Sequence, residues 1–342
     1  MKTVISTTWV LLTIALLPAA SQAAMDIMRN DNGTVVGVNP WSYLNEDVMW
    51  TTTRSSYPHG GKVHGNIKSK LEITDSNWKN SATHNGADNF VLSQAVLRHD
   101  SLPPWYLAFY NARETEYQGG FTSQRYERQT QRTQLIFGYE HPFARGSVGA
   151  ELLAGSESLN ERWQVRYKLY GTYRLTDRLV MFGYLYQDLQ HKRSAGGEFI
   201  NDTDISTSEI EPGIQYIITD STGVWLRSRY SEATMQRKQW GDINDQDWTT
   251  RVGVWHNWDS GLTTTLHSGI GHYRKYNANK TDGEVFQNTR YKYAALGATY
   301  PVSKRFTVAG EVKASDDKQG GSWVTNGKAI NMFYMLSADF NF

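Results

Sequence analysis

The chain has 342 residues, of which 39% are hydrophobic, 13% aromatic and 20% charged, and it contains no cysteine. The lack of cysteine excludes a disulfide scaffold, a thiolate metal site and a thiol nucleophile, and the low apolar share excludes a bundle of membrane helices. The 35 Lys and Arg nearly equal the 34 Asp and Glu, so the strong basic excess of a nucleic-acid-binding protein is absent.

The first 23 residues have the pattern of a targeting segment. Lys2 precedes an apolar run from Trp9 to Leu17, and a proline and a small-residue tail ending at Ala23 follow. This pattern predicts a signal peptide over residues 1–23, cut after Ala23, and the run is too short to span a bilayer as a helix. Loss of Lys2 leaves equal numbers of basic and acidic residues. The chain is therefore expected to be exported.

Residues 24–62 form a separate N-terminal segment in which polar and apolar residues alternate poorly. We expect this segment to be a periplasmic arm. Two alternatives remain open: it folds into the lumen as a partial plug, or it adds two strands to the sheet that follows. The main domain is expected over residues 63–342.

Along this main domain, apolar and polar side chains alternate over long stretches. Between Arg162 and Leu175, one set of alternate positions is apolar and the other is polar. The apolar positions are Trp163, Val165, Tyr167, Leu169, Tyr173 and Leu175. A period of two indicates a β-strand with one apolar face. The stretch exceeds the ~5–6 residues of a typical soluble strand and satisfies the roughly 9–11 residues needed to cross a membrane.

Fourteen such strands are predicted. Six are clear, at 66–73, 162–175, 209–218, 224–230, 306–313 and 331–342. Eight are weaker, near 89–99, 105–117, 128–141, 147–154, 178–189, 248–258, 262–276 and 289–300. Short turns alternate strictly with longer polar segments, which lie near 75–88, 118–127, 155–161, 190–205, 232–247, 277–288 and 316–330. The pattern predicts an all-β protein, a transmembrane antiparallel β-barrel of 14 strands with short periplasmic turns and long extracellular loops. A large soluble β-sandwich would have shorter strands and less regular connections.

Aromatic residues cluster at the predicted strand ends. They are Trp105, Trp163, Tyr173, Trp248, Trp258, Tyr300, Phe340 and Phe342. Such positions suit the aromatic girdles at the two lipid–water interfaces of a barrel. We therefore expect contact with outer-membrane lipid, including lipopolysaccharide.

Charged residues opposite the apolar face are expected to line a water-filled lumen. The predicted pore-lining residues, which would set ion selectivity, are Lys68, Lys70, Glu72, Arg166, Lys168, Glu209, Glu211, Arg227, Arg229, Arg251, Glu311 and Lys313. One interpretation is structural: Glu209 and Glu211 pair with Arg227 and Arg229 across the turn at 219–223, contributing about 1 kcal/mol or less each. The alternative is that a mild excess of basic groups attracts acidic sugars.

Five segments resemble the OmpG-type monomeric porins of bacterial outer membranes. They are LPPWYLAFYNARETEY (102–117), ERWQVRYKLYGTYRLTDRL (161–179), SEIEPGIQYIITDSTGVWLRSRY (208–230), DSGLTTTLHSGIG (259–271) and MFYMLSADFNF (332–342). The resemblance covers about residues 63–342. It implies a fourteen-stranded barrel that works as a single chain and passes small saccharides. Phe342 looks like the terminal signal that such barrels present to the barrel-assembly machinery, although an interface aromatic explains it equally.

The sequence departs from this family at a pair of histidines that switches the family's pore loop. The corresponding positions fall near 260–261 and 285–286 and carry no histidine. His256, His267 and His272 do not reproduce the pair. Because histidine is the side chain that titrates near neutral pH, the family's pH gate is not expected to operate here.

Neither a catalytic site nor a metal or cofactor site is predicted. The chain lacks a Gly-x-Ser-x-Gly motif, and the acidic segment 241–247 lacks the glycine and terminal glutamate of a calcium loop. The leading hypothesis is a non-enzymatic outer-membrane porin for passive diffusion of small saccharides, with acidic oligosaccharides as one possibility. The alternatives are a barrel enzyme, either a protease or a lipid hydrolase, and a non-conducting adhesive barrel.

Overall fold

The computed structural model describes most of the main domain and two short segments before it. The described residues are 27–29, 35–38, 62–78, 86–102, 104–118, 126–157, 162–192, 203–237, 242–278, 284–303, 305–322 and 326–342. The predicted signal peptide lies outside these ranges, as does most of the predicted arm. None of the residues in these ranges forms a helix long and apolar enough to cross a membrane.

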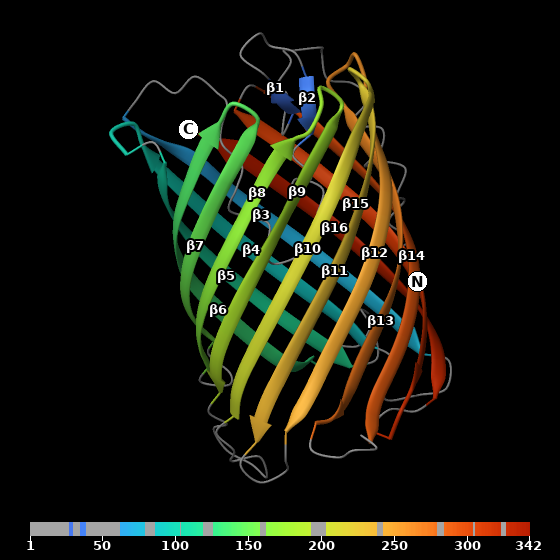
Figure 1. Cartoon of the computed structure of the whole chain (residues 1–342). Coiled ribbons are helices and arrows are strands. Elements are labelled where there is room, and N and C mark those ends of the chain that lie inside the picture. Colours follow the sequence, from blue (N-terminus) through green and yellow to red (C-terminus); the bar gives the residue numbers. More distant parts are fainter. Residues whose placement is uncertain are drawn as a thin grey trace, which may run out of the picture.

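Fourteen antiparallel strands close into one barrel, each paired with its neighbours in the sequence (Figure 1). They are β3 (Val63–Trp78), β4 (Gly86–His99), β5 (Trp105–Gln118), β6 (Tyr126–Phe143), β7 (Gly146–Glu157), β8 (Arg162–Arg174), β9 (Leu179–Lys192), β10 (Thr203–Thr219), β11 (Thr222–Arg237), β12 (Ile243–Asn257), β13 (Thr263–Asn277), β14 (Val285–Pro301), β15 (Phe306–Gly320) and β16 (Gly327–Asn341). The predicted fourteen-stranded antiparallel barrel is confirmed.

The ring is closed where the last strand, β16, pairs with β3. The N–H of Gly65 donates to the carbonyl of Phe342 at 3.1 Å, and the N–H of Phe342 donates to the carbonyl of Gly65 at 3.0 Å. Every barrel strand therefore has a partner on both sides. A sheet in lipid needs this closure, because hydrocarbon offers no hydrogen bonds to a free strand edge.

The strands are longer than their alternation predicts at one end of the barrel. The sequence predicts a connection over 232–247, but β11 continues to Arg237 and β12 already begins at Ile243. Ser231 pairs there with Asp247 in register. Backbone pairing continues beyond the lipid, where both faces of a strand can be polar and the alternation is lost. We call this the long-loop end and the opposite end, which carries connections such as residues 220–221, the short-turn end.

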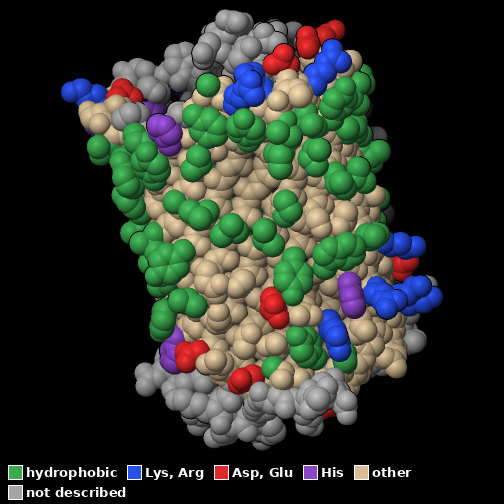
Figure 2. Space-filling view, viewed as in Figure 1, with side chains coloured by type: hydrophobic (Ala, Val, Ile, Leu, Met, Phe, Trp, Pro, Cys, Tyr) green, Lys and Arg blue, Asp and Glu red, His purple; other side chains and the backbone are tan. Residues whose placement is uncertain are grey.

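The outer face of the barrel is apolar. Large hydrophobic side chains on alternate positions of the strands are exposed there, among them Leu107, Leu135, Leu169, Ile214 and Leu336. Figure 2 shows these side chains spread over the wall, with charged side chains gathered mostly toward the two ends. This distribution matches the hydrocarbon band of an outer-membrane barrel between its two polar interfaces.

Aromatic residues contact one another at the ends of the outer face. At the short-turn end, the ring centres of Trp105 and Phe137 are 4.9 Å apart, and those of Trp105 and Tyr139 are 4.7 Å apart. Near the long-loop end, Trp163 stacks on His191 at 5.9 Å. Such rings suit the lipid–water interfaces, where an apolar body and a polar edge are both solvated well.

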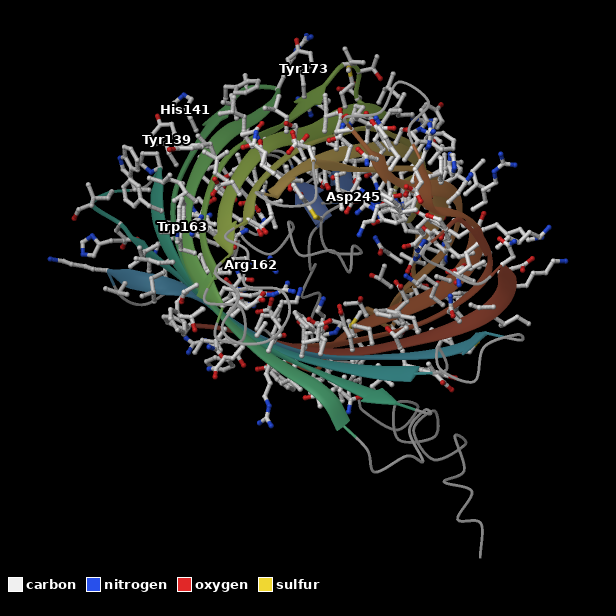
Figure 3. The ribbon with its side chains drawn as sticks, turned by 90° about the horizontal axis from the view of Figure 1, so that it is seen from below. Tyr139, His141, Arg162, Trp163, Tyr173 and Asp245 are labelled. Carbon is white, nitrogen blue, oxygen red and sulfur yellow. The ribbon has the colours of Figure 1, made fainter. Side chains whose placement is uncertain are left out.

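The first two strands do not belong to the barrel. β1 (Ile27–Arg29) and β2 (Val35–Val38) pair with each other in a separate antiparallel sheet, and β2 contacts β10. In Figure 1 the two strands lie at the short-turn end, and in Figure 3 they lie within the outline of the ring.

Candidate functional site

The inner face of the wall consists of the residues that alternate with the exposed apolar ones. On β8, Tyr167 and Leu169 are each 55% exposed, whereas Lys168 between them is 4% exposed. Figure 3 looks along the barrel and shows Arg162 and Asp245 on the lumen side of the wall. The structure places every predicted pore-lining residue on these inward positions: Lys68, Lys70, Glu72, Arg166, Lys168, Glu209, Glu211, Arg227, Arg229, Arg251, Glu311 and Lys313.

Large inward aromatic rings lie directly over glycines of the neighbouring strand. The pairs, each opposite in register, are Gly138 with Tyr106, Gly149 with Tyr170, Gly213 with Phe182, Gly223 with Trp255, Gly253 with Trp225, Gly269 with Tyr293 and Gly271 with Tyr291. A Cβ atom at Gly138 would lie 2.0 Å from Cζ of Tyr106. Only a residue without a side chain lets the ring approach the backbone this closely. The rings therefore cover the wall instead of projecting toward the barrel axis.

Basic side chains lie over several of these rings. The distances from the charged group to the ring centre are 4.6 Å for Arg98 and Tyr106, 5.1 Å for Lys168 and Tyr170, 5.1 Å for Arg227 and Trp225, and 5.4 Å for Lys313 and Tyr293. A cation over an aromatic face within about 6 Å contributes roughly 0.5–2 kcal/mol, depending on its exposure to water. The wall thus has three layers: glycine backbone, aromatic ring and basic group.

We expect Gly138→Ala to disturb this layering and reduce conductance. The new methyl group would displace the Tyr106 ring, whose hydroxyl donates to Oε1 of Glu151 at 2.5 Å. Overpacking of this kind costs about 1–3 kcal/mol. Single-channel conductance and urea unfolding would measure the two effects. Gly310→Ala adds the same methyl group on the outward face of β15, where the nearest atom to its Cβ, the carbonyl oxygen of Met335, lies 3.5 Å away. It controls for the general effect of replacing a strand glycine, and equal effects of the two variants would contradict the expectation.

A buried carboxylate bridges two arginines near the middle of the wall. Arg227 and Arg251 are opposite each other in register on β11 and β12. Oε1 of Glu211 lies 2.7 Å from Nη1 of Arg227, and Oε2 lies 3.1 Å from Nη2 of Arg251. Two guanidinium groups directly opposite each other repel, so the carboxylate on β10 stabilises both. The predicted pairing of Glu211 with Arg227 is confirmed.

Glu209 and Arg229 have partners that the sequence does not predict. The hydroxyls of Tyr184 and Tyr186 donate to Glu209 at 2.6 and 3.1 Å, and Arg229 forms an ion pair with Asp247 of β12. The tyrosines belong to β9 and Asp247 to the extension of β12 beyond its predicted start. The sequence pattern predicts a strand over the tyrosines but leaves its inward face open, and it places Asp247 in a connection.

The remaining predicted residues mostly have partners across the inner wall. The pairs are Lys70 with Glu72, Lys168 with Glu151 at 3.2 Å, Arg166 with Asp188 at 3.0 Å, and Glu311 with His267 at 3.3 Å. Lys313 lies 4.6 Å from the ring centre of Phe333, and Lys68 is partly exposed on β3. Opposite charges thus alternate over this part of the wall.

Strand β9 supplies inward residues that sequence reasoning missed. Tyr184, Tyr186, Asp188 and Gln190 all face inward, while Leu185 faces outward. The first four inward positions of β9 are Val180, Phe182, Tyr184 and Tyr186, so both faces of this half of the strand have apolar or aromatic side chains. The one available signal was the polar pair Asp188 and Gln190 near its end.

A closed barrel of long antiparallel strands, apolar outside and charged inside, defines a transmembrane channel of the outer-membrane type. The OMPG-porin 1 family matches residues 49–342. The chain belongs to this porin family, and it resides in the outer membrane. No curated protein matches the chain.

Among solved structures, the chain is similar to the CymD monoaromatic hydrocarbon channel, with 12% identity, a TM-score of 0.50, and coverage of 82% of this chain and 88% of that one. It is also similar to the Pseudomonas putida toluene transporter TodX, with 10% identity, a TM-score of 0.47, and coverage of 95% and 99%. At these identities, the similarity to CymD concerns the fold alone.

Proposed function

We propose that the barrel passes small saccharides by passive diffusion through its lumen. The observation that supports this most directly is the inner face, where partly exposed charged groups such as Arg132, Arg162 and Arg229 face the lumen. Uncharged polar solutes exchange their hydrogen bonds with water for those of such a wall at little cost. A hydrocarbon would gain nothing from it, because apolar solutes favour surfaces without ionised groups.

Two measurements test this function. In planar bilayers, the purified protein is expected to produce discrete conductance steps. In liposome swelling, neutral sugars are expected to enter at rates that fall with increasing size. A protein that inserts but never conducts would contradict the proposal and favour an adhesive barrel; a rim Ser or Asp that is essential for turnover of a peptide or lipid would favour an enzyme.

The segment before the barrel is proposed to restrict the short-turn mouth. β1 and β2 pair only with each other among the described strands and lie within the outline of the ring at that end (Figure 3). Deletion of residues 24–62 is therefore expected to leave a folded barrel and to raise single-channel conductance. Unchanged conductance would instead assign the segment to a periplasmic arm that does not enter the solute path.

We also propose that the chain is exported by a cleaved signal peptide and works as a monomer among outer-membrane lipids and lipopolysaccharide. Phe342 would present the assembly signal. Deletion of Phe342 also removes the two backbone hydrogen bonds to Gly65 that close the ring, so less folded barrel is expected in the outer membrane. Phe342→Ala keeps the backbone, and a normal level of heat-modifiable barrel in that variant would show that the side chain carries no signal.

A further inference from the structure

A small polar cavity opens in the inner wall toward the long-loop end. It has a volume of about 210 Å³, and its walls come from strands β5 to β10. Arg132, Arg162 and Arg166 line it together with Glu157 and Asp188. Pockets for drug-sized ligands usually measure about 300–1,000 Å³, so this cavity suits one small polar ring at a time.

Glu157 supports two of the three arginines. Nε of Arg132 donates to Oε2 of Glu157 at 2.9 Å, and Nη2 of Arg162 donates to Oε1 at 3.3 Å. The carboxylate thus holds the two guanidinium groups, which come from β6 and β8, side by side. Planar guanidinium groups fixed in this way match the geometry of a carboxylate ligand.

Asp188 supports the third arginine and leaves one acceptor unused. Its Oδ2 receives hydrogen bonds from Arg166 at 3.0 Å, from Gln164 at 2.5 Å and from Gln190 at 3.0 Å. Its Oδ1 is buried, and no donor in the described part of the chain reaches it. A buried carboxylate oxygen without a donor is costly, and a hydroxyl group in the cavity would satisfy it.

In this cluster three arginines face two carboxylates that line the cavity, and the arginines are the more exposed partners. The side chains of Arg132, Arg162 and Arg166 are 30%, 21% and 13% exposed, whereas those of Glu157 and Asp188 are 3% and 2% exposed. Arg132 also pairs with Glu114 at 3.4 Å, and that carboxylate is 31% exposed. At Arg162 and Arg166 the carboxylate partners are the more buried groups, so there the lumen meets the guanidinium groups. In the ion pair of Lys168 with Glu151, by contrast, both side chains are covered, at 4% and 7% exposed.

We infer that this cavity binds the carboxylate of a sugar acid on its way through the barrel. The guanidinium groups of Arg162 and Arg166 bind the carboxylate, and a ring hydroxyl donates to Oδ1 of Asp188. Because guanidinium groups and an acceptor lie together, the cavity favours a uronic acid over the neutral sugar of the same size. This inference rests on the proposed saccharide channel and assigns its preferred substrate class.

The test compares glucuronate with glucose, which differ by one carboxylate. Each sugar is added to the open channel in potassium chloride, and the concentration that halves the current is measured. The half-blocking concentration of glucuronate is expected to be about tenfold lower than that of glucose, which is what one charge-assisted hydrogen bond provides. Arg162→Gln is expected to abolish the difference, and Arg166→Gln is the second variant if the first does not fold.

Lys275→Gln is the matched control. Its side chain is 21% exposed, as is that of Arg162, and it faces inward near the same end of the barrel. It removes the same charge but leaves the cavity intact, so the preference for glucuronate is expected to persist. Equal loss in both variants, or no preference in the native channel, would overturn the inference. Glucose-driven liposome swelling separates the two proposals: if glucose enters, the channel function stands whatever the result for glucuronate.

Discussion

Replacing Glu211 with alanine is expected to lower the free energy of unfolding of the barrel by about 3–5 kcal/mol, because the change leaves two buried guanidinium groups without their shared carboxylate. Arg227 and Arg251 oppose each other directly and are almost wholly covered. Urea unfolding in phospholipid vesicles, followed by tryptophan fluorescence, would measure the change.

Asp247→Ala provides the control for this prediction. Asp247 of β12 pairs with Arg229 of β11, and these strands also carry Arg251 and Arg227. Both side chains of this pair are partly exposed. Water compensates for the lost partner there, so the cost is expected to be about 1 kcal/mol or less. A cost for Glu211→Ala no larger than this would show that the middle of the wall is hydrated more freely than its packing indicates.

Leu169→Arg is expected to lower the free energy of unfolding by about 2–4 kcal/mol, the usual cost of a basic residue on the lipid face near the bilayer midplane. Leu169 lies near the middle of β8 and points outward with 55% of its surface exposed. The same unfolding measurement in vesicles would detect the change.

The control places the same charge on the other face of the same strand. Thr172 alternates with Leu169 and lies toward the lumen, where its Oγ1 is 3.3 Å from Oγ of Ser147. Thr172→Arg loses that hydrogen bond but keeps its charge in water, so a cost of about 0.5–1.5 kcal/mol is expected. If the two arginine variants cost the same, Leu169 does not face hydrocarbon.

The contrast between β8 and β9 shows how far alternation predicts this fold. On β8, one face meets water and the other meets lipid, so polar and apolar residues alternate. The sequence therefore shows which residues of β8 face the lumen. On β9, Phe182 and Tyr184 face inward but are buried against the wall, and Nζ of Lys168 lies 5.8 Å from the Tyr184 ring centre. An inward residue that is covered by other side chains can be apolar, so its polarity does not show whether its face of the strand meets water or lipid.

The ion pairs were predictable where a tight turn sets the register. β10 ends at Thr219 and β11 begins at Thr222. The register places Gly213 opposite Arg227, so Glu211, two residues away on the same face of β10, reaches Arg227 diagonally. The contact of Glu211 with Arg251 spans β11 to reach β12, and the connection between those strands is longer and its register is not set by a turn. The arginine cavity is built from β5 to β10, and three of the connections between these strands are longer segments. Sequence spacing therefore could not assign Arg132 and Arg162 to one site.

The glycines beneath the inward rings set how far those rings extend into the lumen. Each ring is recessed because the residue opposite it has no side chain, so the free diameter depends on positions that never touch the permeant. Exchange of a single hydrogen for a methyl group at one of them would push a ring toward the axis while strand number and charge stay constant. Related barrels with the same topology are therefore expected to differ in the free diameter of the lumen when they differ only at these glycines.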